Sequence, residues 1–176
     1  MKTPTTYRPV QILLHWAIAL LFLALFVFEN SMGRALRTVL NGGTVSYTLG
    51  VGFHVFGGLL VLALATWRLA LRRVAGVPPP PANDPPMQTL AAHAVHWGLY
   101  AMMFLIPVLG AVAWFGGVAL AGDAHSLSTG VLQFLVGAHV LGALWHQYGL
   151  KDGLVYRMWF RGPSLQQARI KPENQD

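Results

Sequence analysis

The stretch from His125 to His139, HSLSTGVLQFLVGAH, decides how this chain folds. It contains no Asp, Glu, Lys or Arg, and it carries a histidine at each end. An α-helix rises about 1.5 Å and turns about 100° per residue, so these 14 steps span about 21 Å and end about 40° short of four full turns. Both imidazoles therefore point to one face of an apolar helix, near opposite sides of a hydrocarbon layer about 30 Å thick. Polar rings inside a membrane span are costly and tend to mark functional sites.

The composition of the whole chain is that of a membrane protein. Of its 176 residues, 55% are hydrophobic and only 10% are charged, and the mean hydropathy is +0.50. Soluble domains carry about 25% charged residues. The absence of cysteine excludes disulfides, thiolate-bound iron–sulfur clusters and covalent c-type haem attachment. The net charge of +6 does not indicate nucleic-acid binding, because the basic residues follow the expected membrane topology rather than one patch.

Four apolar segments are each long enough to cross a bilayer as a helix. They cover approximately residues 10–28, 48–70, 90–115 and 126–150. A helix satisfies its own backbone hydrogen bonds, as lipid requires. We therefore predict an all-α integral membrane protein, a four-helix transmembrane bundle. The bundle is expected to form a single domain over residues 1–162, followed by a polar C-terminal tail over residues 163–176.

Basic residues predict the orientation of this bundle. With four spans, both termini and the second connection share one side, and ten of the 12 Lys and Arg residues fall there. Only Arg34 and Arg37 fall on the other side. The positive-inside rule predicts both termini in the cytoplasm of a multi-pass membrane protein. The second connection, GVPPPPANDPP from Gly76 to Pro86, is rich in proline and is expected to be an extended, semi-rigid surface segment.

Four histidines fall into two layers of this predicted bundle. His54 lies about two turns into the second helix and pairs in depth with His125, at the outer start of the fourth helix. His15 lies about one turn into the first helix and pairs with His139, on the inner side. Each pair joins two helices, as a planar macrocycle clamped from both faces requires, and neutral imidazole is a good axial ligand for haem iron. We therefore predict two haems, although a single histidine near a helix end is more often interfacial or hydrogen-bonded.

The other three histidines are candidates for quinone binding or proton transfer. His93 and His96 share a face of the third helix near its cytoplasmic end. They could bind a metal, but zinc usually needs three or four ligands and no third is evident. Hydrogen bonding to a haem propionate, a quinone or water is favoured over a merely interfacial role. His146 follows His139 by seven residues and could protonate or hydrogen-bond a quinone, or it could be interfacial.

A series of short motifs runs along nearly the whole chain. They are ILLHW (12–16), FHVFGG (53–58), AHAVHWGLY (92–100), IPVLG (106–110), GAH (137–139), LWHQY (144–148) and KDGLVYRM (151–158). In order and spacing, this series resembles the prokaryotic cytochrome b561 family. The resemblance implies a four-helix bundle in the bacterial cytoplasmic (inner) membrane, with two b-type haems that are each bound by two histidines. Carried onto this chain, the iron ligands are His15, His54, His125 and His139.

The resemblance also implies a function. Family members exchange electrons with a quinone, and superoxide oxidation has been attributed to the family. We therefore expect an oxidoreductase that carries electrons between a periplasmic donor, such as superoxide oxidised to dioxygen, and membrane quinone. Arg34 and Arg37 could attract the superoxide anion. Some members have a second histidine directly after the position of His146, where this chain has Gln147, so a role that depends on that extra imidazole does not carry over.

Two other functions fit parts of the pattern. The protein could be a cytochrome b anchor subunit that relays electrons from a hydrogenase or dehydrogenase partner to quinone. It could also be a haem-free transporter whose histidines relay protons. The short predicted connections favour a small self-contained cytochrome over the anchor subunit.

Overall fold

The computed structural model describes residues 4, 6–27, 30–81 and 84–159. The regular elements of these ranges are all helical, which confirms the predicted fold class. The five α-helices are α1 (Pro9–Val27), α2 (Asn30–Leu40), α3 (Leu49–Ala75), α4 (Pro86–Gly116) and α5 (Ala119–Leu144). A π-helical turn, η1 (Trp145–Leu150), continues α5, and a short 3-10 helix, η2 (Leu154–Met158), follows. The predicted C-terminal tail, 163–176, lies outside the described residues.

Four helical segments are long and apolar enough to cross a membrane. They contain 19, 27, 31 and 32 residues and correspond to α1, α3, α4 and α5 continued by η1. Their large apolar side chains face outward in many places, as at Leu20, Leu23 and Phe134. Helices that are apolar on most of their surface are typical of membrane spans.

Local signals set the ends of these helices. The Thr48 hydroxyl accepts a hydrogen bond from the Val51 N–H at 3.3 Å and caps the start of α3. α4 ends at Gly116, and Gly117 follows with a positive φ of 65°, a conformation that closes a helix at little cost when the residue is glycine. The connection from α4 to α5 is therefore only two residues long, and α5 begins earlier than predicted. His125 is the seventh residue of α5 and does not lie at the outer start of the fourth helix, where the sequence predicted it.

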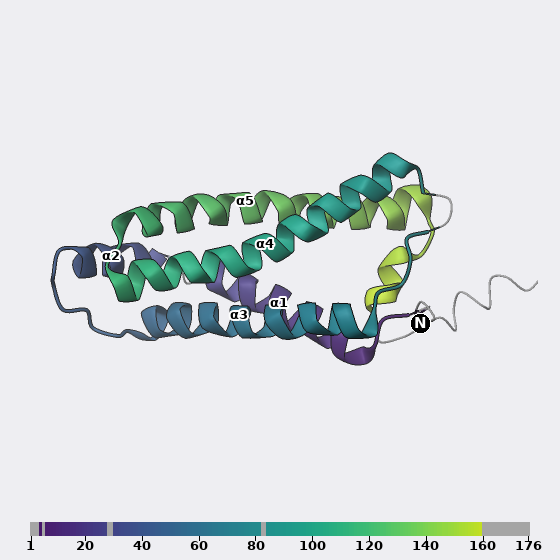
Figure 1. Ribbon diagram of the computed structural model, residues 1–176. Coiled ribbons are helices and arrows are strands. Elements are labelled where there is room, and N and C mark those ends of the chain that lie inside the picture. Colours follow the sequence, from purple (N-terminus) through teal and green to yellow (C-terminus); the bar gives the residue numbers. More distant parts are fainter. Residues whose placement is uncertain (1–3, 5, 28–29, 82–83, 160–176) are drawn as a thin grey trace, which may run out of the picture.

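The four long helices pack as successive neighbours: α1 against α3, α3 against α4, and α4 against α5 (Figure 1). α2 lies at one end of the bundle, beside the start of α3 and the end of α4, and we call this the α2 end. The proline-rich connection and η2 lie at the opposite end, which we call the η2 end (Figure 1). Two apolar clusters hold the bundle together. Ile18, Ala65, Tyr100 and Met103 join α1, α3 and α4, and Ala35, Val51 and Trp114 join α2, α3 and α4.

α2 is a helix that the sequence analysis did not predict. Its Ala35 is buried against α3 and α4, and its Leu36 lies so close to α5 that a Cβ at Gly122 would come within 2.9 Å of the leucine Cδ2. Arg34 and Arg37 are exposed on its other face. α2 is therefore an amphipathic helix that covers one end of the bundle and displays two positive charges there.

Candidate functional site

The four predicted histidines come together as two pairs at two levels of the bundle. The ring centroids of His54 on α3 and His125 on α5 are 6.1 Å apart, with an angle of 60° between the ring planes. Those of His15 on α1 and His139 on α5 are 6.0 Å apart, with an angle of 65°. Because α5 contributes one ring to each pair, the levels are separated by 14 helical steps, about 21 Å. The first pair is nearer the α2 end and the second is nearer the η2 end.

α4 positions the ring of His125 although it contributes no ring to that pair. His125 Nδ1 lies 2.8 Å from the Ile106 carbonyl oxygen. One turn further along α4, a Cβ at Gly110 would come within 3.0 Å of Nδ1 and 3.1 Å of Cε1. An Nδ1–H that donates to a carbonyl selects the tautomer in which Nε2 keeps its lone pair. Gly110 and the Ile106 carbonyl therefore present Nε2 of His125 as the free acceptor.

The remaining paired rings have nitrogens without a protein partner. His54 Nδ1 is buried and has no hydrogen-bond partner in the part of the chain that the structure describes. No hydrogen bond links the rings of His15 or His139 to other described residues either. Buried polar groups are normally satisfied. Imidazole nitrogens left free in an apolar interior are the donor set that a haem iron takes as axial ligands, so these residues fit that cofactor.

A fifth histidine lies beside the pair near the η2 end. The His96 ring centroid is 5.2 Å from that of His139, with the planes 74° apart. Its Nδ1 lies 2.6 Å from the Ala92 carbonyl oxygen of its own helix. His93, predicted to share this environment, instead lines an open pocket of about 700 Å³ together with Asp84, Thr89 and the linker prolines. The sequence placed His93 and His96 on one face of α4 but did not show that only His96 reaches the paired rings.

Basic side chains near the η2 end have partners within the protein. Arg68 Nη1 donates to the Gln11 carbonyl oxygen at 2.7 Å. The Arg72 guanidinium lies over the rings of Trp97 and Tyr100, 5.4 and 5.8 Å from their centroids. The two contacts of Arg72 are cation–π interactions, which are favourable where the cation is desolvated. Burial raises the pKa of the nearby Tyr7 hydroxyl, and the positive charge of Arg72 opposes this shift.

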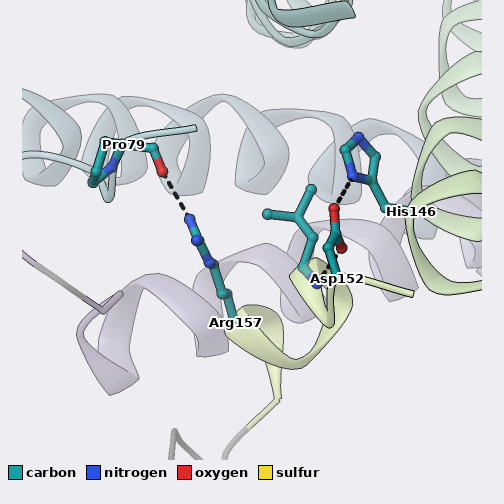
Figure 2. A network of polar contacts seen from close by, with 5 residues as sticks. Pro79, His146, Asp152 and Arg157 are labelled. Atoms are coloured by element: carbon teal, nitrogen blue, oxygen red, sulfur yellow. Dashed lines mark hydrogen bonds and ion pairs between the residues drawn. The ribbon is translucent and has the colours of Figure 1, made fainter. Parts of the chain in front are cut away.

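His146 forms a polar pair that the sequence analysis did not identify. It lies in the π-helical turn η1, and its Nδ1 is 2.5 Å from Asp152 Oδ2 (Figure 2). Lys151 adopts a positive φ of 55°, which turns the chain back toward η1. The other carboxylate oxygen of Asp152 accepts the Leu154 N–H at 2.9 Å. His146 is therefore held in one orientation by an acidic partner six residues away.

Four apolar spans that hold facing imidazoles inside the bundle define a membrane cytochrome of the b type. The chain belongs to the prokaryotic cytochrome b561 family, whose model matches residues 6–161. It is 40% identical to cytochrome b562 of Cereibacter sphaeroides, over 86% of this chain and 94% of the relative. It is 30% identical to cytochrome b561 homolog 1 of Escherichia coli, over 86% and 96% of the two chains.

A third relative has a name that specifies a reaction. The chain is 26% identical to the probable superoxide oxidase CybB of Yersinia pestis, over 86% of this chain and 94% of the relative. Family membership and the four spans make this protein a multi-pass bacterial membrane cytochrome that binds haem b and transfers electrons. It is an oxidoreductase in this general sense.

Proposed function

We propose that the protein carries two b-type haems and passes electrons from a donor outside the cytoplasm to membrane quinone. The observation that carries this proposal is the pair of facing imidazoles at each of two levels of one bundle. His54 and His125 would hold one haem, and His15 and His139 the other. A bound b-type haem supplies reversible one-electron chemistry at its iron.

The chain's own residues prepare each ligand position. The Ile106 carbonyl and Gly110 fix the tautomer and the direction of His125. His96 lies edge-on to His139 and limits the rotation of that ring. A neutral imidazole offers the nitrogen lone pair that a haem iron takes as a ligand.

We assign the α2 end to the donor side. The positive-inside rule places the η2 end in the cytoplasm and the α2 end in the periplasm, with the protein in the inner membrane. The α2 end displays the exposed Arg34 and Arg37, which would attract an anionic donor. Superoxide fits this charge, and one relative is named a probable superoxide oxidase. Two superoxide anions would leave as two molecules of dioxygen, and their two electrons with two protons would convert one quinone to one quinol.

We assign the quinone and its protons to the η2 end. His146 and Asp152 form a hydrogen-bonded acid–base pair close to the end of the α5 span. A positioned imidazole can hold a proton and deliver it to a reacting oxygen. His93 lines the open pocket beside the linker and is a second polar group for a quinone headgroup. His96 is assigned to orienting His139, because its ring lies edge-on to that of His139 with the centroids 5.2 Å apart.

Haem content and reduced-minus-oxidised spectra of the detergent-purified protein test this proposal. We expect two b haems per chain in the wild type, and loss or spectral change of a different one in His125→Ala and His139→Ala. His93→Ala is the matched control, because it removes an imidazole outside the two pairs. One haem per chain would overturn the two-haem assignment. A colourless protein from haem-replete cells would favour the haem-free transporter.

A further inference from the structure

Three polar side chains from separate segments converge at the η2 end of the bundle. Asp84 comes from the proline-rich connection, His146 from η1, and Asp152 from the turn between η1 and η2. One ligand atom of each lies within 4.8 Å of the others. The His146 and Asp152 side chains are only 12% and 22% exposed, and Asp84 is partly buried. The cluster is therefore sheltered but reachable from water.

The charge in this cluster is not balanced by lysine or arginine. The chain has only six Asp and Glu residues, and two of them, Asp84 and Asp152, face each other here. Within the described ranges, the only ion pair of either carboxylate is the one between Asp152 and His146. Arg157, which comes close along the chain, donates instead to the Pro79 carbonyl oxygen at 2.7 Å (Figure 2). Two ionised carboxylates this close repel each other, and a bound cation would relieve that repulsion.

The segments that carry the three side chains are held in place. The bond from Arg157 to Pro79 ties the connection to η2 (Figure 2). The Asp84 N–H donates to the Pro81 carbonyl oxygen at 3.2 Å, and two prolines follow directly. Pro85 and Pro86 restrict the backbone at Asp84 and on its C-terminal side. The convergence is thus a property of the fold and not of one flexible side chain.

We propose that Asp84, His146 and Asp152 form a binding site for a divalent transition-metal cation of the zinc type. One imidazole and two carboxylates, with a position left for water, match the three-ligand pattern of open zinc sites. In a tetrahedral site with zinc–ligand bonds of about 2.0–2.2 Å, two ligand atoms lie about 3.3–3.6 Å apart. Ligand atoms that are now up to 4.8 Å apart would therefore have to approach by about 1 Å. The metal would replace the proton shared by His146 and Asp152, and it would cross-link the connection to the C-terminal turn.

This site has a consequence for the proposed reaction. A metal on His146 removes the imidazole that we assign to proton delivery, so zinc would slow quinone reduction. That consequence rests on the proposed function, whereas metal binding itself does not. Metal binding and the role of His146 in quinone reduction can therefore be disproved separately, so zinc binding must be measured directly.

Titration calorimetry of the detergent-purified holoprotein with Zn²⁺ tests the site, with Mg²⁺ as the competing hard cation. We expect one saturable zinc site. Loss of a residue that only supports a metal ligand costs about 10- to 100-fold in metal affinity. Loss of a ligand itself should cost at least as much, so we expect zinc affinity to fall at least about tenfold in each of Asp84→Asn, Asp152→Asn and His146→Gln. Asp123→Asn and His93→Gln are matched controls and should leave binding unchanged, since neither residue belongs to the cluster. Unchanged haem spectra would show that each variant is folded.

Two results would overturn the site. One is the absence of saturable zinc binding to the wild-type protein. The other is zinc binding that His93→Gln weakens as much as Asp84→Asn does, which would place the metal in the neighbouring open pocket. If zinc binds at the cluster but leaves quinone reduction unaffected, the metal site stands and the proton-delivery role of His146 is wrong.

Discussion

The ring of His125 rests directly on the backbone of Gly110. A Cβ at position 110 would come within 3.0 Å of His125 Nδ1, which is closer than side chains normally approach, and the same nitrogen lies 2.8 Å from the Ile106 carbonyl oxygen. The absence of a side chain at position 110 therefore lets α5 bring its histidine against α4. This contact brings the motif IPVLG beside His125, which follows Gly110 by 15 residues in the sequence.

Replacing Gly110 with alanine should disturb one haem only. The new methyl group would push the His125 ring away from the Ile106 carbonyl, so the haem held with His54 should shift in reduction potential and in its low-spin electron paramagnetic resonance signal. Gly130→Ala on α5 is the matched control, because a Cβ there meets nothing within 4 Å and both variants gain about 1 kcal/mol of helix propensity. Identical spectra and potentials for Gly110→Ala and wild type would show that the contact does not orient a ligand.

Replacement of His15 and replacement of His96 should affect haem binding very differently, although both rings face His139. We expect His15→Ala to lose the haem near the η2 end. His96→Leu should keep both haems and shift only the potential of that haem, because we assign His96 to orienting the His139 ring and not to holding the iron. Redox titration of the absorption spectra separates the two outcomes. If His96→Leu loses the haem and His15→Ala keeps it, the ligand pair is His96 with His139.

Neutralising the charges on α2 should slow the reaction with superoxide. Arg34→Gln with Arg37→Gln removes two exposed positive charges from the proposed donor end, and we expect a severalfold lower second-order rate and a weaker dependence on ionic strength, since local charge raises encounter rates by about 10-fold or more. Pulse radiolysis measures the rate directly. Arg73→Gln, an exposed arginine at the η2 end, is the control. An unchanged rate in the double variant would rule out steering by α2.

His146→Gln should slow electron transfer to quinone but not to ferricyanide. Quinone reduction consumes protons whereas ferricyanide reduction does not, so only the first depends on a proton donor. Positioned acids and bases contribute about 100-fold or more, and we expect a loss of at least tenfold for the quinone reaction. Stopped-flow oxidation of the pre-reduced protein compares the two acceptors on one sample. Equal rates with quinone for the variant and the wild type would remove His146 from the reaction.

Much of the architecture followed from the order of residue types along the chain. Apolar runs of the length of a bilayer predicted the four spans, because membrane helices satisfy their hydrogen bonds internally and need little information from distant residues. The alignment of His125 with His139 followed from helical geometry alone. The depth of His15 and His54 followed from counting turns from predicted helix ends. Errors of several residues at those ends, as at the start of α5, did not change which histidines paired.

The contacts that give these residues their environments were decided by tertiary packing. α2 was missed because an 11-residue helix with two arginines resembles a polar connection until its apolar face meets α3 and α4. The sequence did not show that His96 turns toward His139 while His93 turns toward the linker, because two residues on one helix face separate only when neighbouring helices are placed.

The same limit applies to the cluster at the η2 end. Asp84, His146 and Asp152 lie far apart or in irregular segments, so no periodic pattern marks them. Their convergence depends on how the proline-rich connection docks on the π-helical turn and η2. Helix length, composition and periodicity are local properties and can be determined from the chain alone. The partners of a side chain depend on the rotation and spacing of whole helices, which are set only when all of them pack together.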